Sequence, residues 1–148
     1  EPKNCITRHL IGYFSIAIGC VLTMILQSSS VFTSSLVPLV GMGIVSLERV
    51  FPLTLGSNIG TTFTGVIAAL GQSSNFKESI QIALVHTFFN ISGILIWYPI
   101  PFLRSAPLAI ARYLGERSSH HRWFAIAYLV CVFLITPGIL LGLAIISE

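Results

Sequence analysis

Long apolar stretches alternate with short polar segments along the whole chain. The longest stretches contain no Asp, Glu, Lys or Arg, and they cover residues 10–47, 50–76, 79–103 and 123–147. A helix needs about 20 residues to cross the hydrocarbon core of a bilayer. Each stretch is long enough for one crossing, and the first could make two crossings or one re-entrant pair. The pattern therefore predicts an all-α membrane protein.

The first stretch changes character in its middle. Apolar sequence leads to Gln27, where the letters QSSS begin, and Thr33 and further serines follow. Serine and threonine favour helix starts because their side chains accept hydrogen bonds from free backbone N–H groups. We therefore expect a re-entrant helical hairpin over residues 10–43, with a break at QSSS and a second helix over residues 31–41.

The second stretch is interrupted by the letters GSNIGTT at residues 56–62. Glycine and asparagine are poor helix formers, so residues 50–71 are predicted to be a transmembrane helix that is unwound at its middle. Non-helical backbone is tolerated at this depth only where protein or water satisfies it. A second interpretation stays open, because Gly56 and Gly60 form a GxxxG pattern that is typical of helix packing.

The remaining chain predicts two more transmembrane helices, over residues 80–99 and 123–146. His86 and Asn90 lie one turn apart on the first, where they favour contacts between helices. Pro137 and Gly138 predict a kink in the second. Because the chain lacks an initiator Met and both ends resemble cuts, we expect it to be part of a longer protein.

Composition and charge narrow the functional class. Only 9% of the 148 residues are charged, against about 25% in soluble domains. The basic residues gather at residues 104–122, which predicts a cytoplasmic connection. That cluster is too short and too closely flanked by spans to indicate a nucleic-acid interface. Three widely spaced cysteines indicate neither a disulfide framework nor a transition-metal site.

The two polar interruptions offer different chemistry. A helix that starts at residues 28–30 presents N–H groups, hydroxyls and the positive end of its dipole, which attract anions. The second interruption offers oxygen acceptors suited to a small hard cation. Secondary transporters divide anion and sodium binding in this way near the midplane. The candidate cation ligands are Ser57, Asn58, Thr61, Thr62 and Thr64.

Other functional classes are weaker. An ion channel would need a continuous pore lining, whereas the polar groups here cluster at one depth. An intramembrane serine hydrolase would need a base near Ser28–Ser30, and His86 is the only plausible candidate in the spans. A structural membrane subunit, whose small and polar motifs serve helix packing, stays open. The chain is not expected to be an enzyme.

Residues 21–70, from VLTMILQSSS to GVIAAL, closely resemble the second repeat of the type II sodium-dependent phosphate cotransporters. The later segments IALVHTFFNISGILIWYPIP and ERSSHHRWFAIAYLVCVFLITP fit the same region. The resemblance implies one half of an inverted-repeat transporter in the plasma membrane. It also implies sodium-coupled symport of inorganic phosphate by alternating access, with sodium as the coupling ion and no other cofactor.

The resemblance also implies roles for individual residues. Ser28, Ser29 and Ser30 would contact phosphate, and Gln27 would shape the hairpin tip. Ser57, Thr61 and Thr64, with Asn58 close by, would belong to sodium sites. The family's sites draw on a first repeat as well, so this chain would hold half of each site. Its partners would then be phosphate, sodium, the lipid bilayer and that missing repeat.

Overall fold

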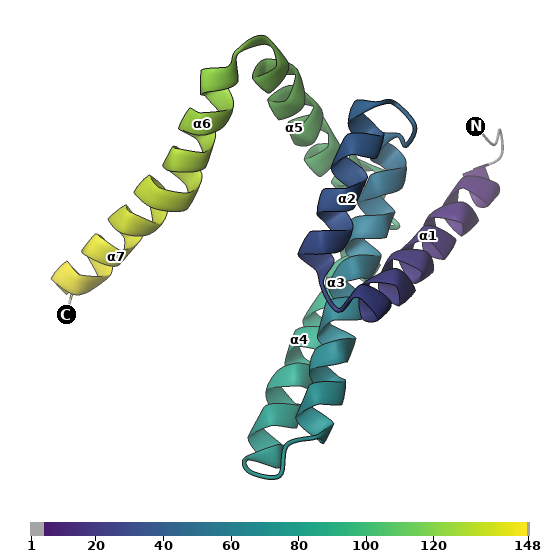
Figure 1. The fold of residues 1–148 in the computed structure, drawn as a ribbon, viewed down its shortest axis with the longest axis vertical. Coiled ribbons are helices and arrows are strands. Elements are labelled where there is room, and N and C mark those ends of the chain that lie inside the picture. Colours follow the sequence, from purple (N-terminus) through teal and green to yellow (C-terminus); the bar gives the residue numbers. More distant parts are fainter. Residues whose placement is uncertain (1–4, 148) are drawn as a thin grey trace. The chain divides into compact units, whose positions relative to one another are not determined.

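The computed structural model describes residues 5–147, and this part of the chain contains helices and no strand. Its helices are α1 (Cys5–Leu26), α2 (Ser29–Gly41), α3 (Leu47–Leu70), α4 (Phe76–Trp97), α5 (Pro101–His120), α6 (Arg122–Val130), the π-helical turn η1 (Cys131–Ile135) and α7 (Thr136–Ser147). The expected all-α class is confirmed (Figure 1).

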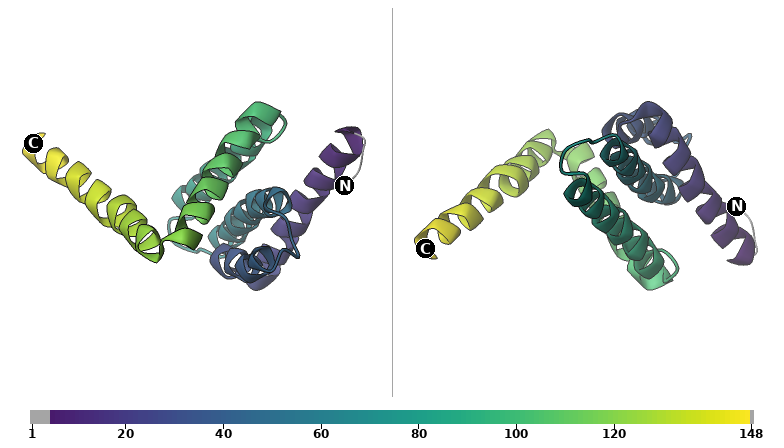
Figure 2. Two further views of the ribbon diagram at one scale, coloured as in Figure 1. Left: turned by 90° about the horizontal axis from the view of Figure 1, so that it is seen from above. Right: turned by 90° about the horizontal axis from the view of Figure 1, so that it is seen from below.

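Helix α3 is the centre of the first of two compact units, Glu1–Ser105. It contacts α1, α2 and α4. The chain turns back between α3 and α4, so that α4 runs antiparallel along α3, whereas the link between α1 and α2 lies beside the middle of α3 (Figure 1). The views from above and below show the same grouping (Figure 2). The segments with the QSSS and GSNIGTT letters thus belong to helices in contact.

The contact between α1 and α3 is close because glycines line it. A Cβ atom added at Gly56 would collide with the backbone carbonyl of Ile16, and one added at Gly19 would collide with that of Leu53. Gly60 faces Cys20 in the same way. Small residues let helix backbones approach closely in membranes. The GxxxG pattern therefore serves packing in this structure.

Tyr98 joins three helices of the first unit. Its side chain is 2% exposed, and its hydroxyl lies against Gly12 of α1, where a Cβ atom would collide with it. The Tyr98 ring meets Tyr13 edge to face at 5.2 Å and stacks on Phe51 of α3 at 6.5 Å. The Arg104 guanidinium lies 5.4 Å from the centre of the same ring. Such ring contacts add to the stabilisation that burial provides.

The second unit, Ala106–Glu148, holds most of α5 and the last span. The cytoplasmic connection that we predicted over residues 104–122 is largely a helix, and it continues through Pro107. In the last span the irregularity is the π-helical turn η1, directly before the predicted kink at Pro137. Proline has no N–H to donate, and the Thr136 N–H and hydroxyl both reach back five residues to the Cys131 carbonyl.

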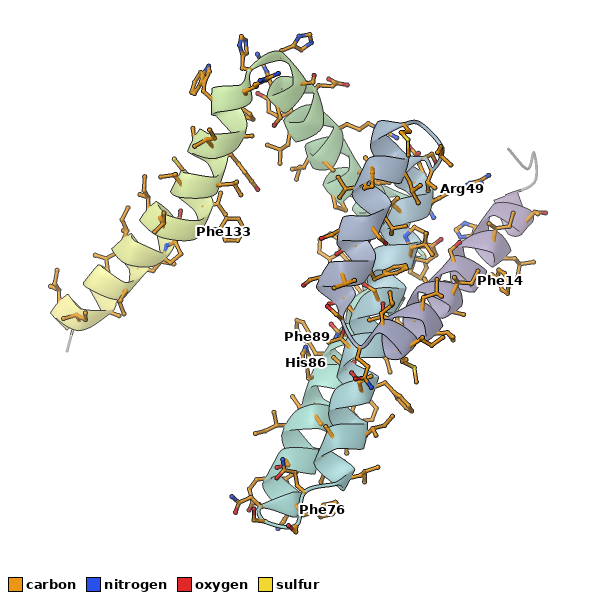
Figure 3. All side chains as sticks on the ribbon, in the orientation of Figure 1. Phe14, Arg49, Phe76, His86, Phe89 and Phe133 are labelled. Atoms are coloured by element: carbon orange, nitrogen blue, oxygen red, sulfur yellow. The ribbon has the colours of Figure 1, made fainter. Side chains whose placement is uncertain are left out.

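Within residues 5–147, four helical segments are long and apolar enough to cross a membrane: His9–Leu26, Leu47–Leu70, Phe76–Trp97 and Arg122–Ile146. Helix α2 is apolar but shorter. Large apolar side chains are exposed along these segments, among them Phe14, Phe89 and Phe133, which project from their helices (Figure 3). Contiguous exposed apolar surface of this kind suits a lipid environment.

Candidate functional site

The QSSS segment breaks the first stretch, as predicted. Helix α1 ends at Leu26, and Gln27 adopts the left-handed conformation with a φ angle of 54°. Ser28 is extended and caps α2, because its Oγ accepts a hydrogen bond of 3.2 Å from the Val31 N–H. Helix α2 begins at Ser29 rather than at residue 31, because Ser28 is already its N-cap.

The start of α2 is a compact group of hydrogen-bond donors. The first N–H groups of a helix have no partner within the helix, and here the Ser29 and Ser30 N–H groups precede the capped Val31. No acidic residue stands in this turn. Ser28 and Ser29 are half-buried and Ser30 is exposed. The turn can therefore present N–H groups and hydroxyls to an anion at the positive end of the helix dipole.

The prediction of a broken second span is wrong. Helix α3 is continuous from Leu47 to Leu70 and passes through GSNIGTT without unwinding. Its glycines face α1 at close range, and this packing outweighs their low helix propensity. The unwound carbonyls that we expected as cation ligands are therefore helical carbonyls in this structure.

The hydroxyls of α3 bond to the helix itself. Ser57 Oγ donates to the Thr54 carbonyl at 2.8 Å, and Thr61 Oγ1 donates to the Ser57 carbonyl at 3.1 Å. Thr62 and Thr64 donate to carbonyls three residues earlier. Back-bonding of this kind is common for serine and threonine in helices. It uses the hydroxyl proton and leaves oxygen lone pairs available to a cation.

The five candidate cation ligands do not face one way. Ser57 and Thr62 are buried, at 0% and 3% exposure. Thr61 and Asn58 are exposed, and the Asn58 carbonyl accepts a hydrogen bond of 3.4 Å from the Asn90 side chain of α4. Their spacing of three and four residues places Ser57, Thr61 and Thr64 on one side of α3. Asn58 and Thr62 lie away from that side.

The GSNIGTT segment lies against α1, and both helices that flank the QSSS break contact α3. Ile16 meets Gly56, and Cys20 meets Gly60, four residues further on in both helices. Helix α2 also contacts α3.

Two polar residues outside the motifs complete this part of the molecule. Asn90 connects α4 to α3, as its position predicted, whereas His86 is exposed on α4 (Figure 3). Sequence reasoning missed Thr23, whose side chain is fully buried against Gly60. The sequence feature that could have indicated this residue is a hydroxyl one helical turn before Gln27 in an otherwise apolar run. Among the described residues, no three His, Cys, Asp or Glu side chains gather as a metal site.

Comparison with known proteins gives a consistent result. The profile of a family described as Na+/Pi-cotransporter matches residues 6–116. The chain is 56% identical over 137 residues to sodium-dependent phosphate transport protein 2B of Rattus norvegicus, which covers 92% of this chain and 20% of the relative. It is 53% identical over 134 residues to sodium-dependent phosphate transport protein 2A of Oryctolagus cuniculus, which covers 90% of the chain and 21% of the relative.

The human protein 2B is also similar, with 54% identity over 137 residues. The chain thus spans about a fifth of the length of these relatives. No solved structure matches it. The relatives are transport proteins and not enzymes. These matches confirm the resemblance that the QSSS and GSNIGTT letters indicated, and they count against the serine hydrolase.

Proposed function

Because the chain belongs to the Na+/Pi-cotransporter family, we propose that it forms part of a sodium-coupled symporter of inorganic phosphate. The observation that carries this proposal is the break between α1 and α2. There α2 starts with Ser29 and Ser30 after the Ser28 cap, and both α1 and α2 contact α3. The chain would supply half of each binding site, and another repeat of the same protein would supply the rest.

The phosphate part of the proposal rests on Ser28, Ser29 and Ser30, with Gln27 shaping the tip. The left-handed Gln27 separates the two helices, so that α2 starts with its own free N–H groups. Hydrogen bonds to a charged ligand are each worth about 1.5–3 kcal/mol. A few such bonds from backbone and hydroxyl donors can offset the cost of taking phosphate out of water.

The sodium part of the proposal rests on neutral oxygens. Ser57, Thr61 and Thr64 share one side of α3, and each hydroxyl already donates its proton to a helical carbonyl. Their oxygen lone pairs would therefore stay available to a hard cation. Asn58 and Thr62 would support the site from neighbouring positions. Phosphate and sodium would bind near each other, which reduces the repulsion that either charge would meet alone.

The wider parts of the proposal follow from the family. Alternating access would expose the site first to one side of the plasma membrane and then to the other. The α1–α2 hairpin would be the re-entrant element, since α2 is too short to cross a bilayer. Residues 104–122 would lie in the cytoplasm because half of the Lys and Arg side chains gather there.

One observation favours a second role for the GSNIGTT segment. Its glycines contact α1 at backbone distance, and its hydroxyls are satisfied within α3. These are the features of a helix-packing element. A purely structural function would leave the donors at the start of α2 without a purpose, so we rank it second.

The experiment that tests the proposal compares Ser29→Ala with Ser35→Ala in the full-length protein. Ser29→Ala removes one hydroxyl from the donor cluster, so the apparent phosphate affinity should fall by about ten- to hundred-fold. Ser35 lies on the same helix, and its hydroxyl donates to the Phe32 carbonyl at 2.7 Å. Its variant should transport normally. The measurement is sodium-dependent uptake of labelled phosphate, corrected for the amount of protein at the cell surface.

Wild-type kinetics for Ser29→Ala at wild-type surface abundance would count against the phosphate site and favour helix packing. Uptake that does not depend on sodium in the wild-type protein would count against the coupling. Non-saturable flux would indicate a channel instead.

A further inference from the structure

Helix α5 differs from the other long helices because it carries charged side chains along its length. It has 20 residues, so at about 1.5 Å per residue it is roughly 30 Å long. Its charged residues are Arg104, Arg112, Glu116 and Arg117. Although α5 is long enough to cross a bilayer, it is therefore not one of the four segments that are also apolar enough.

The chain holds both ends of α5 close to the membrane. Residues 98–100 separate α5 from the candidate span Phe76–Trp97, and His121 alone separates it from the candidate span Arg122–Ile146. An extended chain advances at most about 3.6 Å per residue, so neither link can carry an end of α5 much more than about 10 Å from a span. When both neighbours cross the bilayer and α5 does not, α5 has to lie along one membrane surface.

Over residues 106–120 this helix has an apolar side and a polar side. Ala106, Ile110 and Tyr113 follow one another at spacings of four and three residues, which places them on the same side. All three are exposed, Ile110 at 60% and Tyr113 at 55%. Arg112 and Ser119, which are seven residues apart, lie on the opposite side. Helices with this pattern lie in the membrane interface with their apolar side toward the acyl chains.

Basic side chains gather toward the C-terminal end of α5. Arg112, Arg117 and Arg122 are exposed, and the one acidic residue in the sequence 106–123 is Glu116. The Arg117 guanidinium lies 5.5 Å from the centre of the Tyr113 ring. At a membrane surface such a long side chain keeps its stem on apolar surface and its charged group in the polar layer. The surplus of positive charge complements an anionic surface.

We propose that α5 lies in the plane of the membrane surface and that Arg112, Arg117 and Arg122 bind the head groups of anionic phospholipids. The side with Ile110 and Tyr113 reaches into the acyl chains. Guanidinium groups suit this ligand because they form paired hydrogen bonds with phosphate and carboxylate. In the orientation proposed above, this surface is the cytoplasmic leaflet, which carries anionic lipids. The inference goes beyond the transport function, because the lipid holds α5 and does not enter the transport site.

The test titrates the full-length protein, purified in detergent, with phosphatidylserine that carries a fluorescent acyl chain. One basic residue near an anionic surface strengthens binding by about five-fold. Arg112→Gln combined with Arg117→Gln should therefore weaken phosphatidylserine binding by at least about ten-fold. Lysine at both positions keeps the charges and should stay within about three-fold of the wild type. The control is Lys77→Gln, which removes an exposed basic side chain from the first turn of α4 and should bind as the wild type does.

Glu116→Gln should change the affinity in the opposite direction. It removes the negative charge and keeps the size of the side chain, so phosphatidylserine binding should tighten by about five-fold. Inorganic phosphate and glycerophosphoserine should not displace the lipid, because they lack the acyl chains that the apolar side contacts. Displacement by either competitor would show an anion site and would overturn the lipid surface.

A photoreactive residue identifies what covers the apolar side. We would place p-benzoylphenylalanine at Ile110 or at Ser119 of the full-length protein, illuminate native membranes and analyse the products by mass spectrometry. Lipid adducts should form at position 110 and be rare at position 119. Crosslinks from position 110 to protein would show that another segment or a partner protein covers this side, and they would overturn the inference.

The outcomes separate this inference from the proposed function. Equal phosphatidylserine affinity in the wild type, the double glutamine variant and Glu116→Gln would overturn the inference, whereas sodium-dependent phosphate uptake would still support the proposed function. If the wild-type protein shows no such uptake but the variants change lipid binding as expected, the inference stands and the proposed function falls.

Discussion

Hydroxyl side chains have different roles in this protein, and the conformation of the backbone around each one determines its role. Within a regular helix a carbonyl is always in reach, so Thr61 and Thr64 bond to α3 itself. Ser28 lies outside the helix, in extended backbone, and there its Oγ instead accepts from the Val31 N–H. The break at Gln27 thus converts a serine into a helix cap.

Replacing this cap should weaken the hairpin. Ser28→Ala leaves the Val31 N–H without its acceptor, so the free energy of unfolding should fall by about 1 kcal/mol. Ser28→Asn should retain most of the stability, because asparagine caps helices as well as serine does. Thermal unfolding in detergent, followed by circular dichroism, measures both. An alanine variant as stable as the asparagine variant would show that the cap is not a stabilising contact.

The burial of Tyr98 makes the stability of the fold depend on pH. Removal from solvent raises the pKa of its phenol above the ordinary value of about 10, which outweighs the opposing effect of Arg104. A raised folded-state pKa stabilises the fold below the unfolded pKa, and this contribution is lost as the pH rises through the folded pKa. The Tm should therefore fall above about pH 10.

Tyr98→Phe should reduce this alkaline fall in Tm, because it removes the buried phenol. The measurement is the Tm of each protein between neutral pH and the alkaline limit of the detergent. An identical fall in Tyr98→Phe and wild type would show that other groups cause it.

At the scale of elements, α3 shows how packing overrides local preference. Gly56, Asn58 and Gly60 disfavour a helix when taken alone. The helix persists because the glycines allow the backbone of α1 to come into contact with it. The Asn58 backbone carbonyl also accepts a hydrogen bond from the Asn90 side chain of α4. An element that appears broken in sequence is therefore the centre of the first unit.

Two alanine variants on α3 separate packing from propensity. At Gly56 a Cβ atom would collide with the Ile16 carbonyl, which is backbone and cannot rotate away, whereas at Gly65 it would meet nothing within 4 Å. Gly56→Ala should destabilise the protein by about 1–3 kcal/mol, the usual cost of overpacking. Gly65→Ala should be neutral or stabilising by up to about 1 kcal/mol, since alanine favours helices. Equal thermal stability of the two variants would contradict the close α1–α3 contact.

At the scale of the whole molecule, exposed apolar helices and unevenly placed charges set the orientation. Helix α4 is long and apolar enough to cross a membrane, and such a crossing would put the turn before it and the chain after it on opposite sides. Arg112, Arg117 and Arg122, with His120 and His121, gather in the second half of α5 and just beyond it. Cytoplasmic loops carry such an excess of basic residues.

Cysteine labelling tests this orientation. Ser73 lies in the exposed turn between α3 and α4, and Ser119 is exposed near the end of α5. An impermeant maleimide added to intact cells should label Ser73→Cys and not Ser119→Cys. Permeabilised cells should show labelling at both positions. Labelling of Ser119→Cys from outside would place α5 on the extracellular side.

Local features of the chain could be predicted from the sequence, whereas the contacts between helices could not. The uncharged runs identified the candidate spans, because the residue type alone decides whether a side chain carries a charge that is unfavourable inside a bilayer. The start of α2 followed from QSSS, because a cap and its N–H partner lie within one turn of sequence. The continuity of α3, the packing role of Gly56 and Gly60 and the buried oxygen of Thr23 depend on which face of α1 meets α3. That choice is a property of two helices together, since a glycine that weakens an isolated helix becomes favourable once another backbone lies against it.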